Sequence, residues 1–196
     1  MDLGLKNKAA IITGINNPQG IGANTAFAFA REGVKLALAY KRITHEYDEN
    51  KTDRDGFDRY FKANCGDAAA VEEKLRSLNA DCFVIEGDIS DEQSVISIFD
   101  RAIERFGKVD ILVNNAADCD EDGLDTIETL TQRVIDRTFA VNARGTLLMI
   151  REFVKRRSDY GRIINLSTDA AQVFAGQIAY GASKAAVEAF TRSIAM

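Results

Sequence analysis

The sequence predicts an α/β fold in which a parallel sheet is covered by helices on both faces. Short apolar runs alternate with helical patterns along the whole chain of 196 residues, which is the order expected for a parallel sheet. The runs are rich in β-branched residues and apolar on both faces, as in strands buried under two layers of helices. No internal repeat or low-complexity tract interrupts this order. We therefore expect one doubly wound domain, a Rossmann fold, over residues 1–196.

Each expected element follows from a local pattern. The run KAAIIT is a buried strand, and the small, apolar helix that follows it ends at Gly33. Asp91 lies near the start of a later helix and Gly107 at its end, as capping residues do. In chain order, strands are expected at 8–13, 34–40, 81–88, 109–117 and 161–167, and helices at 21–33, 70–80, 91–107, 127–157 and 180–196.

The segment 41–67 breaks this rhythm, because it is long, charged and poor in apolar residues. A connection of this length is either functional or simply mobile. Its place after the second strand puts it near the far end of a dinucleotide bound to such a sheet. We favour the plainer interpretation, a flexible surface insertion.

Composition narrows the function. Hydrophobic residues make up 46% of the chain and charged residues 28%, with a net charge of -5. This acidic balance argues against a general nucleic-acid binder. No apolar stretch approaches the length needed to cross a bilayer, and the N-terminal residues lack a signal-peptide core. We expect a cytoplasmic protein with no membrane partner.

Cysteine and histidine usage argues against a metal centre. The three cysteines, Cys65, Cys82 and Cys119, are widely spaced and form no CxxC pair. His45 is the only histidine, so neither a histidine-rich metal site nor a Ser-His-Asp triad is expected.

The stretch TGINNPQGIG, directly after the first strand, has the character of a phosphate-binding turn. Gly14, Gly20 and Gly22 allow the backbone to take positive φ and to approach an oxyanion closely. The helix that follows would present free N–H groups and a partial positive charge. Taken alone, such a glycine motif is often only a turn.

A second motif, YGASK, places Tyr180 and Lys184 on one face of a helix. A nearby ammonium lowers the pKa of a phenol, so the pair can exchange a proton with a carbonyl or an alcohol. Ser167, thirteen residues before Tyr180, could polarise the same oxygen. Alone, the pair would more often be an ordinary exposed contact.

Together these motifs resemble the short-chain dehydrogenase/reductase family. The matching stretches occur in family order over nearly the whole chain, and the set is specific. They are TGINNPQGIG (13–22), GDIS (87–90), NNAA (114–117), VNARG (141–145), NLST (165–168) and YGASK (180–184).

The resemblance implies a role for each matching position. Tyr180 would be the acid/base and Asn142 would hold a water in a proton relay from Lys184, which would also bind the nicotinamide ribose. Asn115 and Ala116 would pass beside the adenosine ribose. The full set expected to hold the cofactor is Gly14, Gln19, Gly20, Ile21 and Gly22 at the pyrophosphate, Tyr40, Lys41 and Arg42 after the second strand, Asp88 and Ile89 at the adenine, and Asn115, Ala116, Tyr180 and Lys184.

Four departures qualify the resemblance. The glycine turn is two residues longer than the common form, and Ala117 replaces a commoner glycine. The catalytic hydroxyl is Thr168 when counted from the strand and Ser167 when counted back from Tyr180, and we prefer Ser167. The sequence ends twelve residues after Lys184, where the family continues with further strands and a substrate lid. We therefore expect a fragment or the ordered part of a longer chain, or else a degenerate, inactive protein.

The end of the second strand favours NADP, with NAD as the alternative. An acidic residue there would bind a ribose 2′-hydroxyl and repel a 2′-phosphate. Tyr40 stands in that place, followed by Lys41 and Arg42, which would attract the phosphate. Otherwise the two cations only begin a solvated loop.

The predicted function is an NADP(H)-dependent oxidoreductase acting on a small carbonyl or secondary alcohol. The turn resembles a branch that includes 3-oxoacyl-carrier-protein reductases and glucose dehydrogenases, so a 3-oxoacyl thioester and a sugar or polyol both stay open. Acidic residues at 118–122 would border the substrate cleft and disfavour anions, unless they form only a solvated loop.

The family's helix pairing implies a homodimer or homotetramer. The alternative function is a nicotinamide-binding sensor without chemistry; a methyltransferase ranks last, because it has no use for Tyr180 and Lys184.

Overall fold

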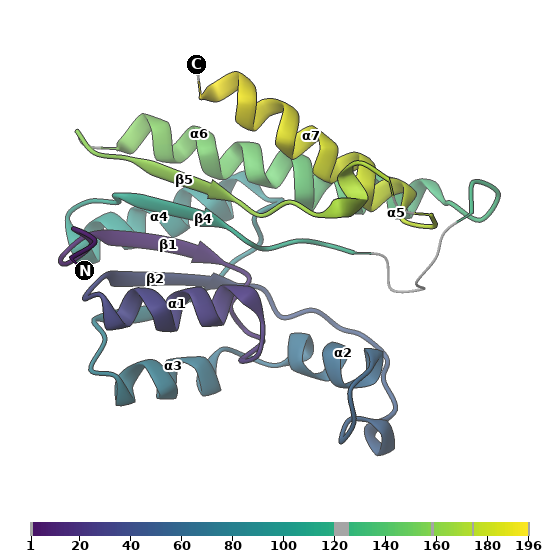
Figure 1. Cartoon of the computed structure of the whole chain (residues 1–196), viewed down its shortest axis with the longest axis horizontal. Coiled ribbons are helices and arrows are strands. Elements are labelled where there is room, and N and C mark those ends of the chain that lie inside the picture. Colours follow the sequence, from purple (N-terminus) through teal and green to yellow (C-terminus); the bar gives the residue numbers. More distant parts are fainter. Residues whose placement is uncertain (1, 120–125, 158, 174, 196) are drawn as a thin grey trace.

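A computed structural model describes residues 2–119, 126–157, 159–173 and 175–195 and shows a five-stranded parallel sheet in the order β3-β2-β1-β4-β5. Helices lie on both faces of the sheet (Figure 1). The strands are β1 (Ala9–Thr13), β2 (Lys35–Tyr40), β3 (Cys82–Glu86), β4 (Ile111–Asn114) and β5 (Arg162–Asn165). The α-helices are α1 (Ile21–Arg31), α2 (Phe57–Cys65), α3 (Ala69–Ser77), α4 (Glu92–Phe106), α5 (Gln132–Phe139), α6 (Thr146–Arg156) and α7 (Ile178–Ile194). The expected doubly wound α/β fold is confirmed.

The side chains of β1 point alternately to the two faces of the sheet and so contribute to two separate core clusters. Ile12 packs into the cluster beneath α1 and α3, whereas Ile11 packs into the cluster beneath α4 and α6. Successive strand residues point to opposite faces, so a strand buried on both sides must be apolar throughout. All five residues of β1 are buried, as the run KAAIIT predicts.

The strand order reverses beside β1, which pairs with β2 on one side and β4 on the other. The chain proceeds from β1 to β2 and β3, then returns to place β4 and β5 on the other side. In open parallel sheets, this reversal leaves a crevice beyond the carboxyl ends of the strands, where ligands bind.

The expected helix 127–157 is divided by a π-helical segment. After Thr131, whose hydroxyl caps α5, the helix continues through η2 (Ala140–Gly145) into α6. At η2 a Cβ on Gly145 would lie 3.0 Å from the Ile89 carbonyl oxygen. The wider turn therefore lets the helix pass close to the loop after β3, and such π segments often lie at functional sites.

The segment 41–67 differs from the structureless insertion favoured on sequence grounds. It contains a 3₁₀ turn, η1 (Glu49–Lys51), and helix α2. The Asn16 amide, in the turn after β1, donates to the carbonyl oxygens of Asn64 (2.6 Å) and Gly66 (3.2 Å). These bonds fix the end of α2 to the glycine turn. Low apolar content hid this helix, because few of its residues face a core.

In the described ranges, no helix is both long and apolar enough to cross a membrane. The same residues contain no group of His, Cys, Asp and Glu side chains able to hold a metal ion.

Candidate functional site: a cleft at the carboxyl ends of the strands

One cleft of about 770 Å³ brings together most of the site residues expected from the sequence. It opens at the carboxyl ends of β1, β2 and β4, where the strand order reverses. The expected residues that line it are Gly14, Gln19, Gly20, Ile21, Tyr40, Lys41, Arg42, Asp88, Ile89, Asn115, Ala116, Ser167, Tyr180 and Lys184. Gly22 and Asn142 are not among the residues that line it, and both are buried. The cleft is within the size range of sites that hold cofactors.

The long glycine turn is folded compactly by Asn17. The Asn17 side chain accepts a hydrogen bond from Gln19 N (3.0 Å), and its carbonyl accepts one from Gly20 N (2.9 Å). Gly14 has a φ of +71°, which favours glycine. Gly20 then precedes α1 without a side chain that could cap it. The free N–H groups of the first turn therefore remain at the cleft, as an anion site requires.

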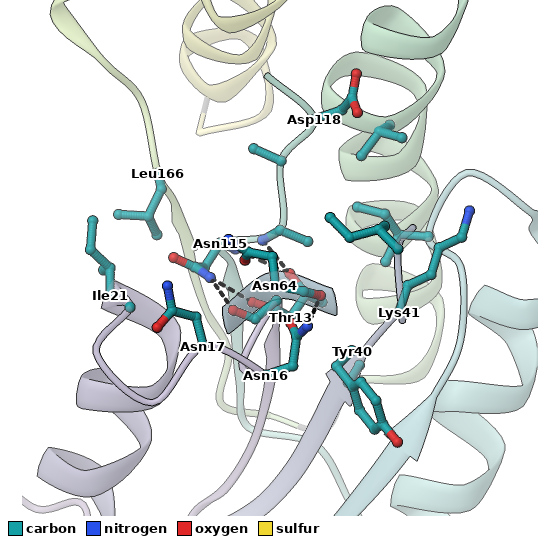
Figure 2. A pocket seen from close by; sticks show the side chains of 18 of the residues that line it. Thr13, Asn16, Asn17, Ile21, Tyr40, Lys41, Asn64, Asn115, Asp118 and Leu166 are labelled. Carbon is teal, nitrogen blue, oxygen red and sulfur yellow. Dashed lines mark hydrogen bonds between the residues drawn. The ribbon is translucent and has the colours of Figure 1, made fainter. Parts of the chain in front are cut away.

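Asn115 holds the ends of β1 and β4 together, directly beneath the turn. Its amide donates to the carbonyl oxygens of Thr13 and Gly14, each at 2.8 Å. The backbone N–H groups of Asn115 and Ala116 donate to the Thr13 hydroxyl at 3.1 and 3.0 Å. Figure 2 shows these bonds at the centre of the cleft, with Lys41 and Leu166 on opposite sides. Asn115 thus fixes the floor of the cleft.

Both cations at the end of β2 are paired with carboxylates at the end of β3. Lys41 Nζ lies 2.5 Å from Asp88 Oδ2. Arg42 binds Glu86 through two hydrogen bonds of 3.0 and 2.7 Å. Burial works to raise the pKa of Asp88, but the hydrogen bonds from Lys41 and Ser90 lower it overall. The cluster is therefore nearly neutral, although all four side chains remain within reach of solvent.

Tyr180 and Lys184 lie at the other end of the cleft, on α7. Lys184 is 4% exposed, and its ammonium donates to the Leu166 carbonyl oxygen at 2.9 Å. Burial lowers the pKa of Lys184 to about 8. The expectation that Lys184 lowers the pKa of the Tyr180 phenol below its usual value is wrong: burial, and more weakly Cys119, raises it. The Lys184 nitrogen is 5.9 Å from the centre of the Tyr180 ring, as expected for residues on one helical face.

The two candidate hydroxyls after β5 have different partners. Ser167 lines the cleft, but its hydroxyl donates to Glu188 on α7 at 2.7 Å. The Thr168 hydroxyl donates to Asp169 at 3.1 Å, and its side chain lowers the pKa of the Tyr180 phenol. Both hydroxyls therefore have a carboxylate partner, and Thr168 is the one that also acts on Tyr180.

Asn142 lies at the π-helical segment and is completely buried. Its amide donates to the Asp118 carbonyl (2.8 Å) and to the Ser183 hydroxyl (3.0 Å), and its oxygen accepts from Asp118 N (2.7 Å). These bonds join the loop after β4 to α7. Asn142 thus contacts α7 at Ser183, between Tyr180 and Lys184.

Sequence reasoning missed Tyr60 and its neighbour Cys119 as site residues. Tyr60 on α2 lines the cleft, and its hydroxyl lies 3.8 Å from the Cys119 sulfur in the loop after β4. The only signal was the long, charged segment that contains Tyr60. Asp118, next to Cys119, is paired with Arg137 at 2.9 Å. Asp120, Glu121 and Asp122, the other expected acidic residues, fall outside the described residues.

Comparison with known proteins finds relatives over nearly the whole chain. A family profile described as "Enoyl-(Acyl carrier protein) reductase" matches residues 14–196. The uncharacterized oxidoreductase YhdF of Bacillus subtilis is 31% identical over 194 residues, which are 97% of this chain and 58% of that protein. The chain belongs to the short-chain dehydrogenase/reductase family. It spans less than two thirds of YhdF and of other curated relatives that it matches.

Solved structures of the family share the fold. A short-chain dehydrogenase from Burkholderia cenocepacia, in complex with NADP, has a TM-score of 0.77 and 29% identity, covering 97% of this chain and 68% of that one. A short-chain dehydrogenase/reductase from Burkholderia phymatum, in complex with NAD, has a TM-score of 0.78 and 26% identity, covering 97% of this chain and 59% of that one.

Proposed function

We propose that this chain carries the cofactor site and the acid/base of an NADP(H)-dependent oxidoreductase acting on a carbonyl or secondary alcohol. One observation carries the proposal. A single cleft has an uncapped helix terminus behind a glycine turn at its middle and the Tyr180–Lys184 pair at one end. An extended dinucleotide fits this distribution, because its phosphates need N–H donors and its nicotinamide needs a nearby acid.

The residues divide the chemistry in the following way. The bound nicotinamide supplies or accepts the hydride. Tyr180 donates a proton to the carbonyl oxygen in reduction and takes it back in oxidation. Because burial raises the pKa of Tyr180, the phenol is protonated at neutral pH and is ready to act as an acid. Lys184, held by the Leu166 carbonyl, favours the phenolate that forms when the proton leaves.

The activity is tested by following NADPH oxidation across a panel of aldehydes and ketones. We expect turnover with at least one carbonyl compound. Tight NADPH binding with no turnover over the whole panel would instead favour a nicotinamide-binding sensor. The substrate could be a 3-oxoacyl thioester or a sugar-like carbonyl, and the same panel separates these classes.

We expect Thr168, rather than Ser167, to provide the hydroxyl that assists Tyr180. Thr168→Val should lower kcat by about tenfold or more, since it removes a hydrogen bond at the reacting oxygen. Thr168→Ser should restore most of the rate, which excludes a purely structural loss. Ser167→Ala should leave kcat nearly unchanged, because its hydroxyl binds Glu188. A larger loss in Ser167→Ala than in Thr168→Val would return the role to Ser167.

Preference for NADPH should depend on the cations after β2. Arg42→Gln should weaken NADPH binding by roughly ten- to a hundredfold, the scale of one charge-assisted hydrogen bond, and leave NADH binding unchanged. Glu86→Gln should strengthen NADPH binding, because it releases Arg42 from its carboxylate. Fluorescence titrations with both cofactors measure this, with Arg59→Gln on α2 as a matched control. Equal effects on NADPH and NADH would contradict the assignment of a 2′-phosphate to this cluster.

We also propose a homodimer or homotetramer formed through the α5–η2–α6 helix. Its outer face exposes apolar side chains, with Ile135, Leu147 and Val154 each about 40% exposed. Phe139 and Ala143 line a shallow depression beside Ile135 and Leu147. Apolar side chains gathered on one helical face are typical of helix pairing between subunits.

A further inference from the structure

Helix α2 is held firmly enough to form a wall of the cleft. Asn16 binds the backbone at its carboxyl end. On the same side, His45 stacks on Phe61 with a ring separation of 4.7 Å. The backbone N–H of His45 also donates to the Cys65 sulfur at 3.3 Å. The segment 41–67 is therefore bound to the glycine turn through Asn64 and Gly66. It is also held together internally by contacts of His45 with Phe61 and Cys65.

Tyr60 projects from this wall toward the catalytic end of the cleft. Its side chain lines the cleft together with Tyr180 and Lys184. Tyr60 and Cys119 are both close enough to Tyr180 for charges on them to affect one another's pKa. Figure 1 shows α2 and the start of α7 both beyond the carboxyl ends of the strands, on opposite sides of the sheet. Tyr60 thus approaches the reacting end from the side opposite α7.

The Tyr60 hydroxyl is a hydrogen-bond donor with a weak partner. The contact with Cys119 is 3.8 Å long, and a thiol is a poor acceptor. Burial, followed by Cys119, raises the pKa of the phenol well above its usual range, so it stays protonated. Yet 44% of the residue's surface is exposed, so a ligand can reach it. A substrate oxygen would satisfy this donor better than sulfur does.

We propose that Tyr60 is a substrate-binding residue whose hydroxyl donates a hydrogen bond to a neutral, hydroxylated carbonyl substrate. This inference rests on the proposed oxidoreductase function and names the substrate class of that site. Apart from the Lys184 ammonium, which donates to the Leu166 carbonyl, the groups named at the reacting end are neutral: the hydroxyls of Tyr60, Thr168 and Tyr180 and the thiol of Cys119. The Asp118 carboxylate is already paired with Arg137 and Thr138.

Such a surface selects by hydrogen bonding rather than by charge. A site that buries hydroxyl donors discriminates against analogues lacking the matching oxygen, because the protein's polar groups are then left unpaired. The cations Lys184 and Arg137 line this end of the cleft, but Lys184 donates to the Leu166 carbonyl and Arg137 is paired with Asp118. Hydroxyl groups next to the carbonyl match the site better.

Kinetics with two aldehydes of equal chain length test this role. Glyceraldehyde carries hydroxyls, and propionaldehyde does not. With NADPH, Tyr60→Phe should raise KM for glyceraldehyde by about two- to tenfold, the worth of one neutral hydrogen bond. KM for propionaldehyde, kcat and the Kd of NADPH should stay unchanged. Tyr47→Phe, on the same segment but outside the cleft, is the matched control and should change neither KM.

Protection of Cys119 gives a second measurement that does not need turnover. Iodoacetamide labelling of the NADPH complex is followed at each cysteine by peptide mass spectrometry. Glycerol should slow labelling of Cys119 relative to Cys82, which lies on β3, and 1-propanol should not. Tyr60→Phe should lose the protection by glycerol.

The outcomes separate the inference from the function on which it rests. If NADPH binds but Tyr60→Phe changes KM for both aldehydes equally, or changes neither KM, the substrate role of Tyr60 is wrong. If NADPH binds and neither aldehyde turns over, the substrate role of Tyr60 is also wrong if glycerol leaves the rate of iodoacetamide labelling at Cys119 unchanged. Failure of NADPH to bind at all overturns the proposed function, and the inference with it.

Discussion

Tyr180→Phe should abolish most of the turnover while leaving cofactor binding intact. The substitution removes only the hydroxyl, and loss of a general acid typically costs about 10² to 10⁴ in rate. The ring keeps its packing on α7, and Lys184 keeps its bond to the Leu166 carbonyl. We therefore expect the Kd of NADPH and the melting temperature to be near those of the unsubstituted protein.

The matched control is Tyr160→Phe. Tyr160 lies just before β5, at the opposite end of that strand from the cleft, where Lys8 and Arg162 rest on its ring. Removing its hydroxyl should not affect turnover. Steady-state kinetics with NADPH and an active carbonyl substrate decide the question. Full activity in Tyr180→Phe would show that Tyr180 is not the proton donor.

Gly22→Ala should both destabilise the fold and weaken cofactor binding. A Cβ at this position would lie 2.5 Å from the Asn115 amide nitrogen and 2.7 Å from the Gly14 carbonyl oxygen. Asn115 cannot move aside freely, because its amide holds the ends of β1 and β4. Overpacking of this kind costs about 1 to 3 kcal/mol, which outweighs the gain of about 1 kcal/mol from replacing a helical glycine by alanine.

Thermal unfolding and NADPH titration measure the two effects of Gly22→Ala separately. Gly66→Ala is the control, because a Cβ there meets nothing nearer than the Ala63 carbonyl at 3.5 Å. It should shift neither the melting temperature nor the Kd by much. An unchanged Kd in Gly22→Ala would mean that the close packing of α1 on Asn115 does not shape the phosphate site.

The fold could be predicted from sequence because its elements are encoded locally. A strand such as β1, buried on both faces, must be apolar throughout, and Gly107 ends α4 with a φ of +78°. The division of the long helix at η2 could not be seen, since it depends on the approach of Gly145 to the Ile89 backbone. The apolar periodicity around it continues without a break.

The site was predictable only where residue type and spacing carry the chemistry. Tyr180 and Lys184 share a helical face in any helix with this spacing, and the structure places both in the cleft. The partners of Lys41 and Arg42 lie just after β3 and at its last residue, more than forty residues away in sequence, so nothing local revealed that these cations are paired. Tyr60 reaches the cleft only because Asn16 binds the end of α2. Such contacts between distant segments require the folded chain.

The most direct test of the account is a fluorescence titration of the chain with NADPH and with NADH. The central claim is that the cleft between the glycine turn and α7 is a dinucleotide site with a preference for the 2′-phosphate. We expect saturable binding of NADPH at lower concentrations than NADH, with the preference reduced in Arg42→Gln. Binding of neither cofactor would contradict the claim, and with it the role of Tyr180 as a proton donor beside a nicotinamide.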